Sequence, residues 1–98
     1  MSVTIDSVLV RESEPKAAVL DDSIVLLSAR AGAYFSFNRV ASEIWTMLAE
    51  PCRVGGIFEE LARSHEVDAR TLARDVTPFL QELLAHRLVR LVDPAQKR

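Results

Sequence analysis

The chain has 98 residues, of which 49% are hydrophobic and 27% charged, and this size and balance fit one globular domain and exclude a disordered or fibrous protein. The formal net charge of −2 offers no overall positive field to a nucleic acid. Its apolar runs are far shorter than the roughly 20 residues of a membrane-spanning helix, and no signal-peptide layout is visible. We therefore expect one cytoplasmic domain over residues 1–98, without a membrane partner, whose ends at about 1–6 and 94–98 are flexible.

The N-terminal part of the chain is predicted to form strands. A short strand is expected at Val8–Val10. The apolar segments Ala17–Leu20 and Ile24–Ala29 flank an Asp-Asp-Ser turn, which is the composition of a hairpin. Gly32 can adopt the positive φ of a short connection, after which the chain returns as Ala33–Phe37. These last three segments predict a three-stranded antiparallel meander.

Two of these strands are apolar on both faces. Ser23–Ser28 is apolar at consecutive rather than alternate positions, which predicts cover on both sides. In the following strand Tyr34, Phe35 and Phe37 point to both sides, because successive side chains alternate. Packing allows either Tyr34 with Ser36 or Phe35 with Phe37 to face the core, and we take Phe35 and Phe37 as the inward pair. The remaining face and the strand edge then need a partner.

Two amphipathic helices are predicted next. Asn38 is a suitable N-cap for a helix over residues 39–50, and Pro51 should end it because the residue before a proline avoids helical dihedrals. A second helix is predicted over Val54–His65. Its start should be loose, since Gly55 and the glycine after it each cost about 1 kcal/mol relative to alanine.

The third helix is predicted to begin after Asp68, a suitable N-cap. Its apolar stripe includes Leu72, Val76 and Phe79, and Leu88–Val92 should form a short final strand. The expected fold class is therefore α+β, a winged helix-turn-helix in which a three-stranded antiparallel meander precedes three helices and a short C-terminal strand.

The sequence contains no catalytic or metal-binding constellation. His65 and His86 lack the partners that metal sites show, and we interpret both as surface histidines. Glu59 and Glu60 are typical of a solvated helix face, and Cys52 is interpreted as structural. We therefore expect a protein that is not an enzyme and uses no metal or cofactor.

A peptide strand added to the edge of Ala33–Phe37 is the partner that best suits this strand. Each main-chain hydrogen bond contributes roughly 0.5 to 1.5 kcal/mol, whereas association costs about 4 to 15 kcal/mol. Four or five such bonds are therefore not enough to offset the cost of association. An apolar groove between the strand and a nearby helix must therefore hold side chains of the peptide.

Two other functions remain open. Helices two and three, joined by a tight turn, match the outline of a DNA-binding winged helix, although Asp68 and Asp75 beside Arg70 and Arg74 offer phosphates mixed charge, so we expect no nucleic-acid partner. Alternatively, the apolar strand could pair with the same strand of a second copy. We expect a monomer or a weak homodimer.

An ordered series of segments over about residues 20–92 resembles the PqqD family. The segments are Val25-Leu26-Leu27, Gly32–Asn38, Ile44-Trp45 with Leu48, Ile57 with Leu61, and Asp75-Val76 with Phe79-Leu80 and Leu83. The resemblance implies a small winged-helix domain that recognises ribosomally made, post-translationally modified peptides. Within the family, the block Tyr34–Asn38 and the Glu50-Pro51 ending look most like free-standing leader-binding subunits of lasso-peptide pathways. The glycine pair at 55–56 departs from the helix-favouring residues common there.

The resemblance also implies partners and a site. The partner would be the leader of a precursor peptide, delivered to a leader peptidase subunit and possibly to a cyclase; the alternative is a chaperone for a radical SAM enzyme in another peptide-modification pathway. The implied peptide-binding residues are Ala33, Tyr34, Phe35, Ser36, Phe37, Leu72, Arg74, Asp75, Val76 and Phe79.

Overall fold

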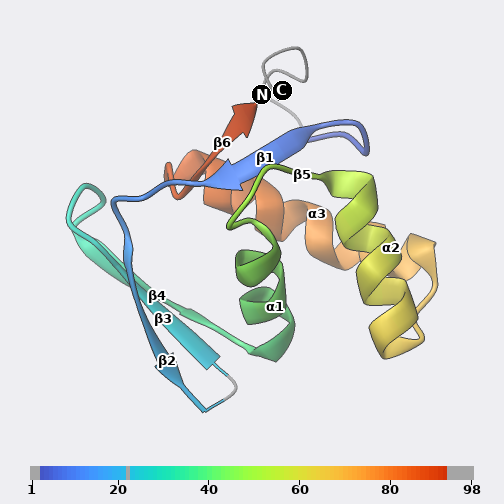
Figure 1. Ribbon diagram of the computed structural model, residues 1–98, viewed down its shortest axis with the longest axis horizontal. Coiled ribbons are helices and arrows are strands. Elements are labelled where there is room, and N and C mark those ends of the chain that lie inside the picture. The colour runs from blue at the N-terminus through green and yellow to red at the C-terminus, as the bar shows by residue number, and fades with distance from the viewer. Residues whose placement is uncertain (1–2, 22, 93–98) are drawn as a thin grey trace.

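The part of the chain that the computed structural model describes, residues 3–21 and 23–92, combines helices with antiparallel strands in an α+β fold (Figure 1). In chain order the elements are β1 (Val8–Arg11), β2 (Lys16–Leu20), β3 (Ser23–Ser28), β4 (Ala33–Phe37), α1 (Arg39–Met47), β5 (Cys52–Arg53), α2 (Val54–His65), α3 (Ala69–Ala85) and β6 (Val89–Val92). The segment 94–98, expected to be flexible, lies outside the described residues.

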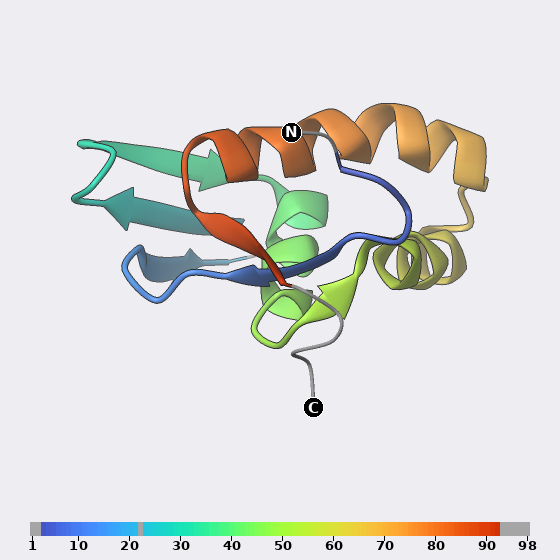
Figure 2. The ribbon, with the colours of Figure 1, turned by 90° about the horizontal axis from the view of Figure 1, so that it is seen from above.

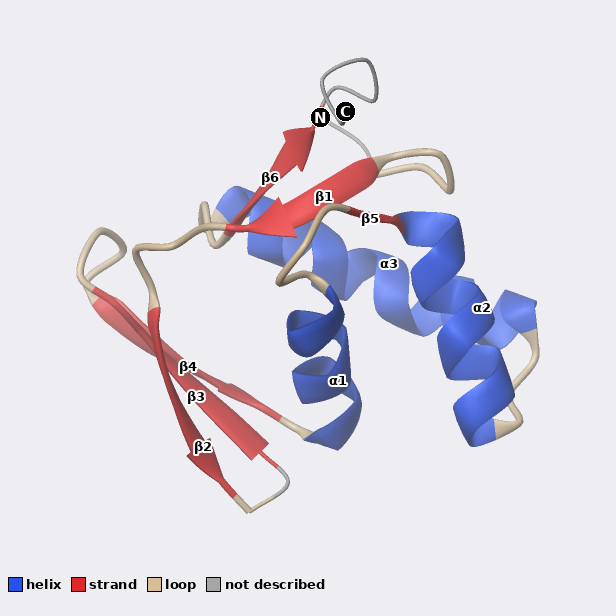
Figure 3. Cartoon of the chain, in the orientation of Figure 1, coloured by secondary structure: helices blue, strands red, loops and turns tan. Residues whose placement is uncertain are grey.

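The strands form two separate three-stranded sheets (Figure 3). One is the predicted meander, in the order β2-β3-β4. The C-terminal strand β6 does not extend this meander but pairs with β1 in a second sheet of order β5-β1-β6. The sequence did not reveal this sheet, because β5 has only two residues and carries no pattern of its own.

The core lies where α1, α2 and α3 meet the two sheets. In Figure 2, α1 occupies the centre of the molecule, and β4 runs beside the C-terminal half of α3. The largest fully buried side chains come from all of these layers: Leu9, Leu26, Ile44, Leu48, Val54, Ile57, Leu61, Leu80 and Leu88. Val3 is also buried and joins this core, so packing begins within the N-terminal segment expected to be flexible.

Within the described chain the meander is covered on one face, and there only along β3 and β4, because every residue of β2 is exposed. In β3, Leu26 is fully buried whereas its neighbour Leu27 is 59% exposed, so the prediction that this strand is covered on both sides is wrong for the described chain. In β4, Phe37 is buried and Phe35 half-buried, while Tyr34 is 70% exposed. This pattern confirms Phe35 and Phe37 as the inward pair.

Helix α1 begins as predicted and ends early. The side chain of Asn38 accepts a hydrogen bond from the amide of Ala41 at 2.9 Å, which confirms it as the N-cap. The helix stops at Met47 rather than continuing to Glu50. The Leu48 carbonyl accepts a hydrogen bond from the backbone amide of Arg11 at 2.9 Å, so tertiary pairing with β1 ends the helix before Pro51 can do so.

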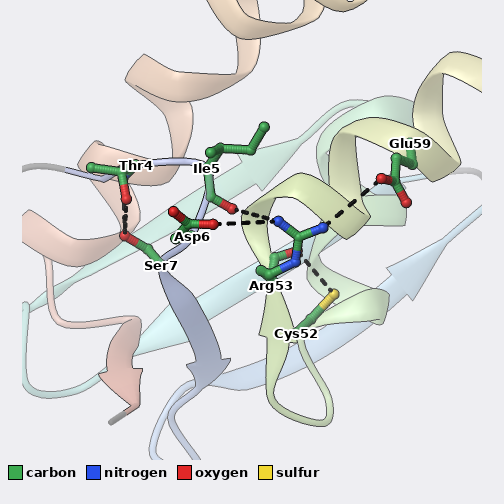
Figure 4. Close-up of polar contacts among 7 residues, drawn as sticks. All are labelled: Thr4, Ile5, Asp6, Ser7, Cys52, Arg53 and Glu59. Carbon is green, nitrogen blue, oxygen red and sulfur yellow. Dashed lines mark hydrogen bonds and ion pairs between the residues drawn. The ribbon is translucent and has the colours of Figure 1, made fainter. Parts of the chain in front are cut away.

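The start of α2 is held by the N-terminal segment (Figure 4). The amides of Val54 and Gly55 donate to the carbonyls of Ser7 and Ile5, at 2.8 and 2.9 Å. These bonds satisfy amides that a helix leaves unpaired at its start, so the loose start expected from the two glycines is not observed. The side chain of Arg53 donates to the same Ile5 carbonyl at 3.2 Å and lies 3.7 Å from Asp6.

Gly55 and Gly56 occupy different surroundings, which predicts opposite effects of alanine. A Cβ at Gly55 would collide with the guanidinium of Arg53, whereas one at Gly56 would meet no atom within 4 Å. We expect Gly56→Ala to raise the free energy of unfolding by about 0.5 to 1 kcal/mol. Gly55→Ala should raise the free energy of unfolding less, or lower it, because the Arg53 side chain must give up its contacts with Ile5 and Asp6. Urea unfolding of both variants measures the difference, and equal gains would contradict it.

The connection from α2 to α3 follows the sequence prediction. Glu66 ends α2 in the left-handed conformation, with φ of 54°. Asp68 then caps α3 by accepting a hydrogen bond from the amide of Thr71 at 2.8 Å, and this bond lowers the pKa of the Asp68 carboxyl. Helix α3 continues through Pro78 to Ala85. None of the helices within residues 3–21 and 23–92 has the length and apolar character needed to cross a membrane.

Candidate peptide-binding site

Strand β4 forms one edge of the meander. Within the described chain it pairs with β3 alone, in a register that sets Leu26 opposite Phe35 and Leu27 opposite Tyr34. The amide and carbonyl of a strand residue point to the same side, and this side alternates along the strand. Either residues 33, 35 and 37 or residues 34 and 36 therefore present main-chain groups to the open edge.

A groove of about 440 Å³ lies between α1 and α3, with the C-terminal half of α2 at its base. Apolar side chains make up most of its wall: Val40, Ala41, Ile44, Leu61, Val67, Leu72, Val76 and Phe79. Polar side chains stand among them: Asn38, His65, Thr71 and Asp75. A groove with this composition suits an apolar side chain that carries polar neighbours.

The edge and the groove adjoin at one aromatic contact. The rings of Phe37 and Phe79 meet edge to face, with centroids 5.3 Å apart. Asn38, which directly follows β4, lines the groove. At the other end of the strand, Phe35 packs on the His86 ring at 5.0 Å, so the C-terminal half of α3 backs β4 while its first half walls the groove (Figure 2). The C-terminal end of β4 therefore lies next to the groove.

The polar groups of the groove are paired. The His65 ring nitrogen Nε2 lies 3.0 Å from a Glu43 carboxylate oxygen, which links α2 to α1. His65 is half-buried, so its interpretation as a surface histidine needs correction. The Asp75 carboxylate lies 3.3 Å from Nε of Arg74, which is exposed and does not line the groove. Among the described residues no cluster of acidic, histidine or cysteine side chains could hold a metal ion.

The structure brings together most of the residues singled out from the sequence. Leu72, Asp75, Val76 and Phe79 line the groove, and residues 33–37 form the adjoining edge. Arg74 is exposed and does not line the groove.

Sequence reasoning missed the contributions of α1 and its N-cap, of the C-terminal half of α2, of Val67 and of the first turn of α3. These residues are Asn38, Val40, Ala41, Ile44, Leu61, His65, Val67 and Thr71. Val40 and Ile44 have the spacing of an apolar helix face, but this spacing alone does not show which residues reach the core and which line a surface groove.

Glu14 holds the tip of the β3–β4 hairpin. Its carboxylate accepts hydrogen bonds from Ser28 Oγ at 3.0 Å, from the amide of Ala29 at 2.8 Å and from the amide of Arg30 at 3.4 Å. Desolvation raises the pKa of Glu14, but these hydrogen bonds together lower it, and the pKa lies below its usual value of 4.5. The charged carboxylate therefore fixes the tip from which β4 departs.

This arrangement predicts a pH-dependent stability. Because the folded-state pKa is lowered, the contribution of Glu14 is present above the unfolded value of 4.5 and is lost as pH falls through the folded value. Glu14→Gln should therefore destabilise the protein at neutral pH, and its free energy of unfolding should approach that of the wild type as the pH falls below 4.5 and through the lowered folded-state pKa. Urea unfolding across an acidic pH series measures this. Glu50→Gln, which removes one charge from an exposed position, is the control and should show no such convergence.

Comparisons with known proteins identify the family of this chain. Residues 23–89 match the family described as coenzyme PQQ synthesis protein D (PqqD), and since the match spans more than half of the chain, the chain belongs to the PqqD family. A solved structure described as TbiB1 in complex with the TbiA(beta) leader peptide is similar, with a TM-score of 0.75 and 32% identity over 83% of this chain and 94% of that one. No match was found among the curated proteins.

Proposed function

We propose that this protein binds the leader segment of a ribosomal precursor peptide as an added strand on β4. The observation that carries the proposal is the junction at Phe37 and Phe79, where a strand edge that pairs with no other described strand adjoins an apolar groove. The similarity to TbiB1, whose structure contains a leader peptide, supports it. The proposed contact residues are Ala33, Tyr34, Phe35, Ser36, Phe37, Leu72, Arg74, Asp75, Val76 and Phe79, of which Arg74 is exposed and does not line the groove.

The energies require both parts of the site. Five residues of β4 can form only a few hydrogen bonds with a peptide, each contributing about 0.5 to 1.5 kcal/mol against an association cost of about 4 to 15 kcal/mol. A large apolar side chain buried in the groove adds about 1.5 to 3 kcal/mol. Strand pairing therefore sets the direction of the peptide, and the groove supplies affinity and sequence preference.

The wider role that we propose is that of a cytoplasmic adaptor in lasso-peptide biosynthesis. The protein would deliver its bound precursor to a leader peptidase and a cyclase, and it would carry out no reaction itself. In this proposal the α2–α3 pair and the neighbouring strands form a winged helix-turn-helix outline that serves peptide recognition instead of DNA binding.

A titration of isotope-labelled protein with the leader of the precursor encoded beside it tests the proposal. Backbone amide signals of residues 33–37 and of the first half of α3 should shift. Binding should depend weakly on salt, because apolar burial and main-chain bonds release few counterions. Shifts confined to α2 or β6, or a steep salt dependence with DNA as the better ligand, would reject the site.

A further inference from the structure

The wall that α2 contributes to the groove ends at a histidine. Leu61 and His65 are the two residues of this helix that line the groove, and they lie on the same face of α2, one helical turn apart. Leu61 is fully buried, whereas the side chain of His65 is 29% exposed. His65 is also the last residue of α2. The α2 wall therefore runs from the core to the imidazole ring and stops there.

A hydrogen bond to α1 fixes this imidazole ring. Nε2 of His65 lies 3.0 and 3.2 Å from the two carboxylate oxygens of Glu43. A carboxylate only accepts hydrogen bonds, so Nε2 is the donor. Glu43 directly precedes Ile44, which lines the groove from α1. The bond thus ties the end of the α2 wall to the α1 wall and restricts the rotation of the ring.

Glu43 belongs to a second hollow on the other side of this bond. The second hollow has a volume of about 580 Å³, and its wall includes Glu43, Met47 and Gly56. His65 lines the groove but not the second hollow, whereas Glu43 lines the second hollow but not the groove. The pair therefore stands between the two spaces. A smaller side chain at position 65 would extend the groove toward the Glu43 carboxylate.

We propose that His65 determines which apolar side chains of the leader fit the groove, and that Glu43 is a positioning residue that holds His65 in place. This inference rests on the proposed function. The fixed imidazole limits how far a side chain of the leader extends along the α2 wall. Without the imidazole there is room for a larger side chain. A tryptophan can fill this space and can donate its indole N–H to Glu43 in place of the lost histidine.

A size exchange between peptide and protein tests the proposal. The probes are synthetic leaders of the precursor encoded beside this protein, in which each apolar residue in turn is replaced by tryptophan. The protein variants are His65→Ala, Glu43→Ala, which releases the ring, and His65→Gln, whose amide can still donate to Glu43. Arg63→Ala is the control, because it removes a side chain of α2 that is 75% exposed and does not line the groove. Calorimetry gives the affinity of each pair, and urea unfolding checks each fold.

We expect one tryptophan position at which the wild type binds at least about tenfold more weakly than it binds the unmodified leader. His65→Ala should recover at least about fivefold of this affinity, at that position only. Glu43→Ala should recover part of it, because the released ring can move aside. His65→Gln should keep the wild-type preference, and Arg63→Ala should bind every leader within about twofold of the wild type.

Three results would contradict the proposal or its basis. Recovery at no position, or an equal change of affinity for all leaders, would show that His65 does not select side chains by size. A Glu43→Ala variant with the wild-type preference would overturn the positioning role of Glu43, and this result can be read even if His65→Ala does not fold. Failure of the wild type to bind the unmodified leader would reject the proposed function itself.

Discussion

Replacing Thr71 by tryptophan is expected to lower the affinity for the leader peptide about 10- to 150-fold. Thr71 lines the groove from the first turn of α3 and is half-buried, so an indole at this position would occupy space that a peptide side chain needs. Losing the burial of one large apolar side chain costs about 1.5 to 3 kcal/mol, which corresponds to that loss of affinity. Calorimetric titration with the leader measures the effect.

Arg70→Trp is the matched control. Arg70 precedes Thr71 in the same helical turn but is exposed and does not line the groove. Its tryptophan variant should bind the leader within about twofold of the wild type, because surface substitutions usually change little. Urea unfolding of both variants separates a blocked groove from a damaged helix. Tight leader binding by a folded Thr71→Trp variant would show that the groove is not used.

Much of the fold could be predicted because its local signals agree with one another. Asn38 and Asp68 begin helices where the sequence predicts, since each side chain satisfies an amide of the first turn. The α2 bounds, Val54–His65, match the predicted range, because apolar periodicity and flanking residues coincide. The meander follows from its turn residues.

The features that the sequence did not predict depend on contacts between segments that are distant in the chain. β5 exists because β1 lies beside Cys52 and Arg53, and the early end of α1 depends on the amide of Arg11. Neither partner is near in sequence, so no local pattern could reveal them. The groove was missed in part for the same reason, because Ala41 and Leu61 become its wall only through the packing of α1 and α2 against α3.

The consecutive apolar residues of β3 led to a prediction that the structure corrects in an informative way. The pattern predicts cover on both faces, and Leu26 is indeed buried in the core. Leu27 does not, although the chemistry of the strand is the same on both sides. Consecutive apolar residues therefore indicate a strand that is apolar on both faces, but they do not show that the described chain covers both faces.

Proline substitutions along β4 are expected to have alternating effects. At every second residue they should lower the stability of the fold, and at the residues between they should lower the affinity for the leader. Proline removes an amide donor, which is tolerated at the open edge of a sheet but not where the amide pairs with β3. Tyr34→Pro and Ser36→Pro form one set, and Ala33→Pro and Phe35→Pro form the other. One set should lower the free energy of unfolding by more than about 1 kcal/mol, because each ladder bond that is lost leaves a carbonyl of β3 without its donor.

The other set should keep the fold and lose leader affinity. Each outward proline removes one main-chain bond to the peptide, worth about 0.5 to 1.5 kcal/mol, and its ring also blocks the approach of the added strand. Alanine at Tyr34, Phe35 and Ser36 controls for the lost side chains. Urea unfolding and calorimetry on the same variants give the two readouts. A uniform loss of affinity among folded variants, without alternation, would mean that the leader does not pair with β4 as a strand and that the groove alone holds it.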